Sequence, residues 1–360
     1  GGVDLYRLIF AFIIMLYHSY HTFPTGNGYT DSIRIFPDGY LGVEFFFLVS
    51  GALLLLSAQK ARQNVQSIDA GMLGKATAGF MQKKISRIFS VYWAAYLFGF
   101  FCKHIVQTNK GSTVLTDLIY SVWDWLLLSN VKITGAIGWV GGNWYISAML
   151  LGMLFLYPLA LRYKEMFVVV LAPIFFILFL GHYSQEYGNL AVSDEWNGLV
   201  KDGTFRAIGV MSLGCISYAC SQELKKLNFS ERGEFCLAIL EVTLFLSVLV
   251  LLHNHSRDKA DFIILLLLFL LVTLLFSEKS GLNRFYGKFN FLWCRKFTLC
   301  LYLTHISVCD VVNRYFPPVG PELRLIGYIV FSILTAALFS CIVPRLNKSI
   351  IKQAQKILLR

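Results

Sequence analysis

Residues 4–18 read Asp-Leu-Tyr-Arg-Leu-Ile-Phe-Ala-Phe-Ile-Ile-Met-Leu-Tyr-His, and residues 39–51 read Gly-Tyr-Leu-Gly-Val-Glu-Phe-Phe-Phe-Leu-Val-Ser-Gly. Both stretches are apolar enough to lie in a lipid bilayer, yet they carry Arg7, His18 and Glu44. Ionisable side chains inside a membrane are costly and usually mark a functional site. We therefore expect two neighbouring transmembrane helices that hold a site between them.

The spacing of Arg7 and His18 places them on one helix face. They are eleven residues apart, close to three helical turns, so about 16 Å separates them along the axis. With Arg7 toward the inside, we expect His18 and Glu44 toward the outside at comparable depth. The alternatives are an Arg whose head group snorkels to the surface, an interfacial His, and a Glu paired with another Arg.

Composition points to a membrane protein. Of the 360 residues, 56% are hydrophobic and 15% are charged, with mean hydropathy +0.61, whereas soluble domains carry about a quarter charged residues. We predict an all-α polytopic helical bundle, with a membrane domain over residues 1–346 and a short basic cytoplasmic tail over 347–360. We expect segment 114–129 to be interfacial or re-entrant. The ten predicted spans are approximately 4–22, 40–57, 86–105, 143–162, 165–181, 203–220, 234–252, 260–276, 295–314 and 323–343.

The distribution of positive charge predicts the orientation. Of the 32 Lys and Arg residues, 21 fall in segments on the side of the N-terminus and ten on the opposite side. Because cytoplasmic loops are richer in Lys and Arg, we predict that both termini are cytoplasmic. The net charge of +11 does not form basic stripes with interleaved aromatic residues, so we expect no nucleic-acid partner. The eight cysteines form no CxxC pair, and we expect no metal site.

Five motifs in order resemble the acyltransferase 3 family of integral-membrane acyltransferases. They are the pair Arg7 and His18 with ten residues between them, the block 42–51, the basic stretch 80–93, Trp-Tyr-Ile-Ser at 144–147 and Leu-Tyr-Leu-Thr-His at 301–305. The chain departs from the usual pattern at four places. Lys83 and Lys84 stand where Arg is usual, Ser90 replaces a frequent Pro, and Met149 stands where many members carry Glu.

The resemblance implies transfer of an acyl group, usually acetyl from acetyl-CoA, to a carbohydrate or a lipid-linked glycan. It also implies a location in a bacterial inner membrane. We predict that His18 is the general base, that Glu44 orients it and that Arg7 holds the donor. The remaining candidates are a donor-binding group, Lys83, Lys84 and Arg87, and a substrate-binding group, Trp144, Ser147, Tyr302 and His305.

Other interpretations of these residues remain open. The basic group at 83–87 also fits ordinary cytoplasmic charge, and His305 also fits a hydrogen-bonded core histidine. The main alternative function is a secondary transporter or flippase in which Arg7, His18 and Glu44 form an ion relay. The absence of an internal repeat weakens that alternative. The sequence leaves open whether the protein forms a homo-oligomer.

Overall fold

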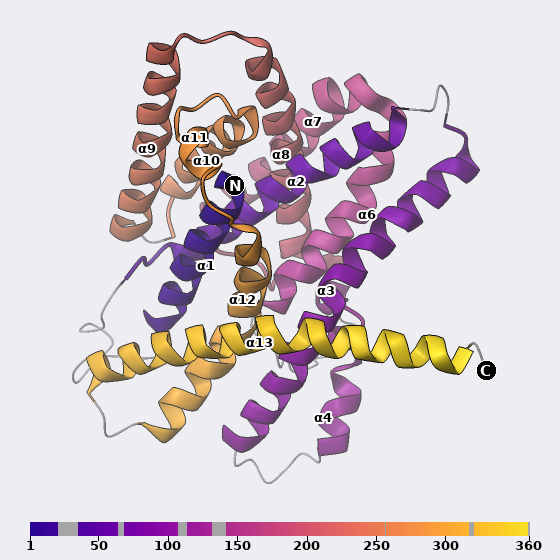
Figure 1. The fold of residues 1–360 in the computed structure, drawn as a ribbon, viewed down its shortest axis with the longest axis vertical. Coiled ribbons are helices and arrows are strands. Elements are labelled where there is room, and N and C mark those ends of the chain that lie inside the picture. The colour runs from indigo at the N-terminus through magenta and orange to yellow at the C-terminus, as the bar shows by residue number, and fades with distance from the viewer. Residues whose placement is uncertain are drawn as a thin grey trace.

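A computed structural model describes residues 1–20, 35–63, 68–106, 114–131, 142–255, 257–316 and 320–358. The fold is an all-α bundle, as predicted, with one two-stranded hairpin. Figure 1 shows long helices side by side. In chain order the elements are α1 (Gly2–Tyr20), η2 (Gly39–Leu41), α2 (Gly42–Arg62), α3 (Ala70–Val106), α4 (Val114–Tyr120), α5 (Val122–Trp125), η3 (Ser129–Val131), α6 (Asn143–Met166), η4 (Phe167–Leu171), α7 (Ala172–Glu186), β1 (Trp196–Asn197), β2 (Val200–Lys201), α8 (Asp202–Lys226), α9 (Glu231–Asn254), α10 (Ala260–Ser277), α11 (Leu282–Tyr286), α12 (Leu292–Tyr315) and α13 (Pro321–Leu358).

Each of the ten predicted spans contains a helix. Within the described residues, seven helical segments are long and apolar enough to cross a membrane, and one of these, Asn143–Glu186, joins two predicted spans. The π-helical turn η4 connects its two halves, α6 and α7. The helices α8 and α12 have more polar sequences and fall outside that group. The count of ten spans and the side of each terminus stay predictions.

The helix α2 lies at the centre of the bundle and packs closely on α8. A Cβ atom added at Gly51 would collide with the backbone of Met211, and one added at Gly214 would collide with the backbone of Leu48. Small residues allow two helices in a membrane to approach this closely. The α2–α8 contact therefore depends on a glycine from each helix.

The neighbouring helices α1 and α2 run side by side, and their contacts define their relative depth. Gly39 lies against Tyr17, whereas Gly42 lies against Ile14 and Phe10. The chain of α2 therefore runs back along α1 toward its N-terminus. Glu44 follows Gly42, so it lies beside a part of α1 that precedes His18 by more than a turn. We expected Glu44 and His18 at comparable depth, whereas these contacts place Glu44 nearer the N-terminus of α1 than His18.

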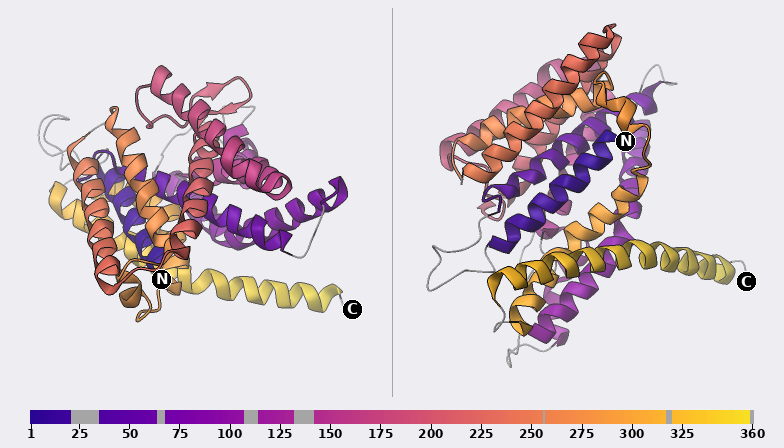
Figure 2. Two further views of the ribbon diagram at one scale, coloured as in Figure 1. Left: turned by 90° about the horizontal axis from the view of Figure 1, so that it is seen from above. Right: turned by 60° about the vertical axis from the view of Figure 1, so that its left-hand side comes forward.

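Three further segments add to or differ from the predicted bounds. The helix α3 begins at Ala70, well before the predicted span start at about residue 86, so residues 80–93 are helical throughout. Segment 114–129 contains α4 and α5, which are too short to cross a bilayer. The long helix α13 continues without a break into the predicted tail. Its C-terminal turns extend past the other helices in Figure 1 and in both views of Figure 2.

Candidate functional site

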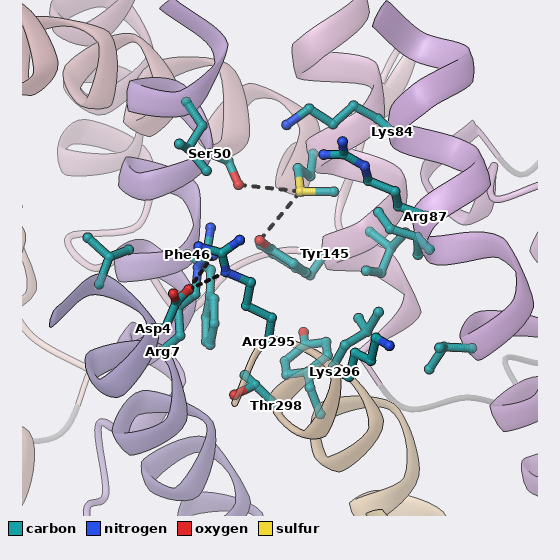
Figure 3. Close-up of a pocket in the computed structure, with 18 of the residues that line it drawn as sticks. Asp4, Arg7, Phe46, Ser50, Lys84, Arg87, Tyr145, Arg295, Lys296 and Thr298 are labelled. Atoms are coloured by element: carbon teal, nitrogen blue, oxygen red, sulfur yellow. Dashed lines mark hydrogen bonds and ion pairs between the residues drawn. The ribbon is translucent and has the colours of Figure 1, made fainter. Parts of the chain in front are cut away.

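A cavity of about 890 Å³ opens among α1, α2, α3, α6 and α12. Figure 3 shows side chains from these elements around it. Basic residues line it from three helices, and the acidic residues of its lining are Asp4 and Glu278. The cavity is therefore net positive. Its basic residues are Arg7 from α1, Lys84 and Arg87 from α3, and Arg295 and Lys296 from α12.

One carboxylate holds two of these cations in place. Asp4 lies 3.3 Å from Arg7 Nη1 and 2.8 Å from Arg295 Nε, and its own side chain is buried. The aspartate thus fixes two guanidinium groups at one end of the cavity (Figure 3). Two arginines that share one carboxylate keep donors for a further anion, because each guanidinium has five N–H groups.

The helical spacing of the predicted donor-binding residues separates them. Lys84 and Arg87 line the cavity, whereas Lys83 is exposed and is not part of its described lining. Adjacent residues on a helix point about 100° apart, so Lys83 and Lys84 cannot share one narrow face. The sequence argument missed Arg295 and Lys296, which it assigned only to cytoplasmic charge. Their signal was a basic pair at the start of the predicted span that contains the Tyr-Leu-Thr-His motif.

An aromatic cluster lines the cavity beside Arg7 and Arg295, and Figure 3 labels two of its rings, Phe46 and Tyr145. Phe46, Tyr145 and Tyr302 all line the cavity, and their ring centroids lie 5.5–6.3 Å apart. The Tyr302 hydroxyl donates to the backbone oxygen of Gly142 at 3.2 Å. These three rings, which we call the ring cluster, join α2, α6 and α12.

Two histidines lie next to each other beyond the ring cluster. The rings of His18 and His305 are 5.2 Å apart, and the rings of Tyr302 and His305 are 6.1 Å apart. Neither histidine belongs to the described lining of the cavity. The structure therefore brings together the two histidines that the sequence placed inside spans, and connects them to the cavity through Tyr302.

His305 has a defined hydrogen-bond arrangement. Its Nδ1 lies 3.0 Å from the backbone oxygen of Leu301, which can only accept, so Nδ1 carries the proton. In the neutral ring, Nε2 is then the atom with a lone pair. It is buried and has no hydrogen-bond partner among the described residues.

Glu44 is paired with a basic residue rather than with His18. Its carboxylate forms a buried ion pair with Arg206 of α8, and both side chains are almost fully buried. The alternative in which Glu44 pairs with another Arg is therefore the observed one. The count of Lys and Arg residues placed Arg206 on the outer side, although residue 206 lies within the predicted span 203–220. An arginine inside a span was the sequence signal for a buried acidic partner.

Comparison with known protein families identifies the chain. A model described as an acyltransferase domain matches residues 1–343. The chain belongs to the acyltransferase 3 family. Comparisons with curated proteins and with solved structures found no significant match.

Two of the predicted substrate-binding residues have structural partners in this acyltransferase. The Trp144 ring lies 5.4 Å from the Arg206 guanidinium carbon. The Ser147 hydroxyl is fully buried and accepts a hydrogen bond from the backbone N–H of Asn130 at 3.1 Å. Neither residue is part of the described cavity lining. Of the four predicted residues, Tyr302 lines the cavity and His305 lies next to it.

The acyltransferase also carries a buried carboxyl group at the start of η2. Asp38 Oδ1 accepts a hydrogen bond from the backbone N–H of Arg257 at 2.9 Å, and the side chain is fully buried. Burial raises the pKa of Asp38 to about 6, although that hydrogen bond acts in the opposite direction.

Within the described segments no group of three or more His, Cys, Asp or Glu side chains is arranged to hold a metal ion.

Proposed function

We propose that this membrane acyltransferase moves an acetyl group from cytoplasmic acetyl-CoA to a hydroxyl of a carbohydrate or lipid-linked glycan on the outer side of a bacterial inner membrane. The observation that carries the proposal is the cavity with five basic side chains from three helices. A cavity of this size and charge suits a ligand with several phosphate groups and a long arm.

The basic side chains that line the cavity are the proposed contacts for the CoA phosphates. Arginine guanidinium groups bind phosphate oxygens in a bidentate manner, whereas lysine acts as a point charge. Arg7, Arg87 and Arg295 supply the first kind of contact, and Lys84 and Lys296 the second. The ordinary excess of cytoplasmic charge would not by itself require these side chains to meet around one cavity.

The histidine pair is the proposed centre of proton transfer. One imidazole removes the proton from the acceptor hydroxyl, and the acceptor oxygen attacks the thioester carbonyl carbon. The new C–O bond forms, the C–S bond breaks, and the proton passes to the CoA sulfur. We retain His18 as the proposed base, with His305 at its side. Glu44 is instead assigned to holding Arg206.

In this scheme the thioester must pass the ring cluster to reach the histidines, since Tyr302 contacts both the cavity and His305. The acceptor then approaches from the other side of the membrane. Membership of an acyltransferase family favours this function over the transporter alternative. In addition, the transporter alternative requires Glu44 as one of three relay groups. Its ion pair with Arg206 argues against that role.

The proposed function is tested with purified protein, labelled acetyl-CoA and a set of glycan acceptors. We expect binding of acetyl-CoA, and release of free CoA that depends on an acceptor. General-base catalysis contributes about 10²–10⁴-fold, so His18→Ala should lose at least about a hundredfold in turnover and keep its affinity for acetyl-CoA. Failure of the wild-type protein to bind acetyl-CoA would reject the proposed donor. Near-normal turnover in folded His18→Ala, with none in His305→Ala, would move the base to α12.

A further inference from the structure

Two hydroxyl groups in the cavity wall point at the same sulfur atom. The Ser50 hydroxyl lies 3.4 Å from Met149 Sδ, and the Tyr145 hydroxyl lies 3.5 Å from it. Figure 3 shows both hydroxyls joined to one sulfur atom, with Lys84 and Arg87 on one side and Arg295 on the other. All three line the cavity. The two hydroxyls come from different helices, α2 and α6.

A thioether sulfur is a weak hydrogen-bond acceptor. The two hydroxyls also interact with each other, and their other partner is this sulfur, a much poorer acceptor than the carbonyl oxygen that receives the Tyr302 hydroxyl. A ligand that brings a carbonyl oxygen to this point would replace two weak interactions with stronger ones, at little loss to the protein.

The position of these hydroxyls identifies the kind of carbonyl. Ser50 and Tyr145 lie between Lys84 and Arg87 on one side and Arg7 and Arg295 on the other (Figure 3). Tyr145 also belongs to the ring cluster, which connects the cavity to His305 through Tyr302. The basic side chains around the two hydroxyls are the proposed phosphate contacts, and the histidine pair lies past the ring cluster. The part of CoA between its phosphates and its thioester is the pantetheine arm, which contains two secondary amides. Aliphatic residues that line the same cavity, Leu53 and Met153 among them, suit the hydrocarbon parts of that arm.

We propose that Ser50 and Tyr145 form a subsite for a pantetheine amide, in which their hydroxyls donate to its carbonyl oxygen and Met149 takes the place of the ligand in its absence. This inference rests on the proposed function, because it takes a CoA thioester as the donor. It adds a recognition site that is independent of charge. The subsite would align the arm so that the thioester points at the ring cluster.

The test uses fragments of the donor that separate the two ends of CoA. Adenosine 3′-phosphate 5′-diphosphate carries the phosphates without the arm, and pantetheine carries the arm without the phosphates. Affinities of both fragments and of CoA are measured by calorimetry on the full-length protein in lipid nanodiscs. The variants are Ser50→Ala with Tyr145→Phe, and Arg87→Ala. The matched control is Tyr157→Phe, which removes a tyrosine hydroxyl from α6 at a ring that stacks on Phe80 outside the cavity lining.

We expect the double variant to bind pantetheine and CoA about tenfold more weakly, since each lost hydrogen bond is worth about 0.5–1.5 kcal/mol. Its affinity for the adenosine fragment should be unchanged. Arg87→Ala should show the opposite selectivity, and Tyr157→Phe should match the wild type. Equal losses for both fragments in the double variant, or no loss for pantetheine, would overturn the subsite. If the wild type bound none of the three ligands, the proposed donor itself would be rejected instead.

Discussion

At the scale of single residues, the most consequential observation is that Glu44 is bound to Arg206. Both side chains are almost completely buried, and the guanidinium also lies 5.4 Å from the Trp144 ring and 6.0 Å from the Tyr40 ring. A buried ion pair is weak evidence for net stability, but loss of one partner leaves an uncompensated charge. The pair links α2 to α8 next to the ring cluster, because Phe46 of that cluster lies two residues after Glu44 along α2.

The first prediction concerns this ion pair. Glu44→Gln should destabilise the folded protein by about 3–5 kcal/mol, since it leaves Arg206 charged and without its partner. Thermal unfolding followed by tryptophan fluorescence in detergent measures the loss. The double variant Glu44→Leu with Arg206→Met should lose less than either single change. A Glu44→Gln protein as stable as the wild type, but with turnover as low as His18→Ala, would return Glu44 to the catalytic role.

At the scale of elements, the close contact of α2 and α8 determines how the site is assembled. These two helices meet where Gly51 faces the Met211 backbone and Gly214 faces the Leu48 backbone. Ser50 of the proposed amide subsite immediately precedes Gly51. The same contact that packs the centre of the bundle therefore also places the α2 side of the cavity.

The second prediction compares two glycine substitutions in helices. Gly51→Ala should lower stability and folded yield, because its Cβ would have to displace backbone atoms of α8. Gly74→Ala, in α3, is the matched control, because no atom lies within 4 Å of an added Cβ there. In an open helical position the change from Gly to Ala stabilises by up to about 1 kcal/mol. Unfolding temperatures of the two variants should therefore move in opposite directions, and equal shifts would contradict the role of Gly51.

At the scale of the whole molecule, the direction of transfer depends on which side of the membrane holds the basic cavity. The basic residues of the cavity come from α1, from α3 and from the first two turns of α12. Four of the Lys and Arg residues counted on the predicted inner side line the cavity: Lys84, Arg87, Arg295 and Lys296. The excess of positive charge on that side therefore reflects the site as well as the topology. An independent measurement of sidedness is therefore needed.

The third prediction is the labelling pattern of two introduced cysteines. In a background without the exposed Cys220, Cys236 and Cys341, Glu186→Cys at the end of α7 should react with an impermeant thiol reagent added from outside. Ala70→Cys at the start of α3 should react only after the membrane is permeabilised. Both positions are exposed helix ends. The reverse pattern would overturn the orientation, and with it the cytoplasmic location of the donor cavity.

The sequence by itself determined the all-α fold, because apolar length and helical period are local properties that the bilayer enforces. It also determined that Arg7 lies on the His18 face and that the chain carries the acyltransferase motifs. Only the tertiary structure decided which distant groups meet. It joined Arg206 to Glu44, His305 to His18, and Arg295 with Lys296 to Arg7, Lys84 and Arg87. Apolar helices can pack in many arrangements, and the choice among them rests on contacts such as Gly51 on α8, between residues far apart in the chain.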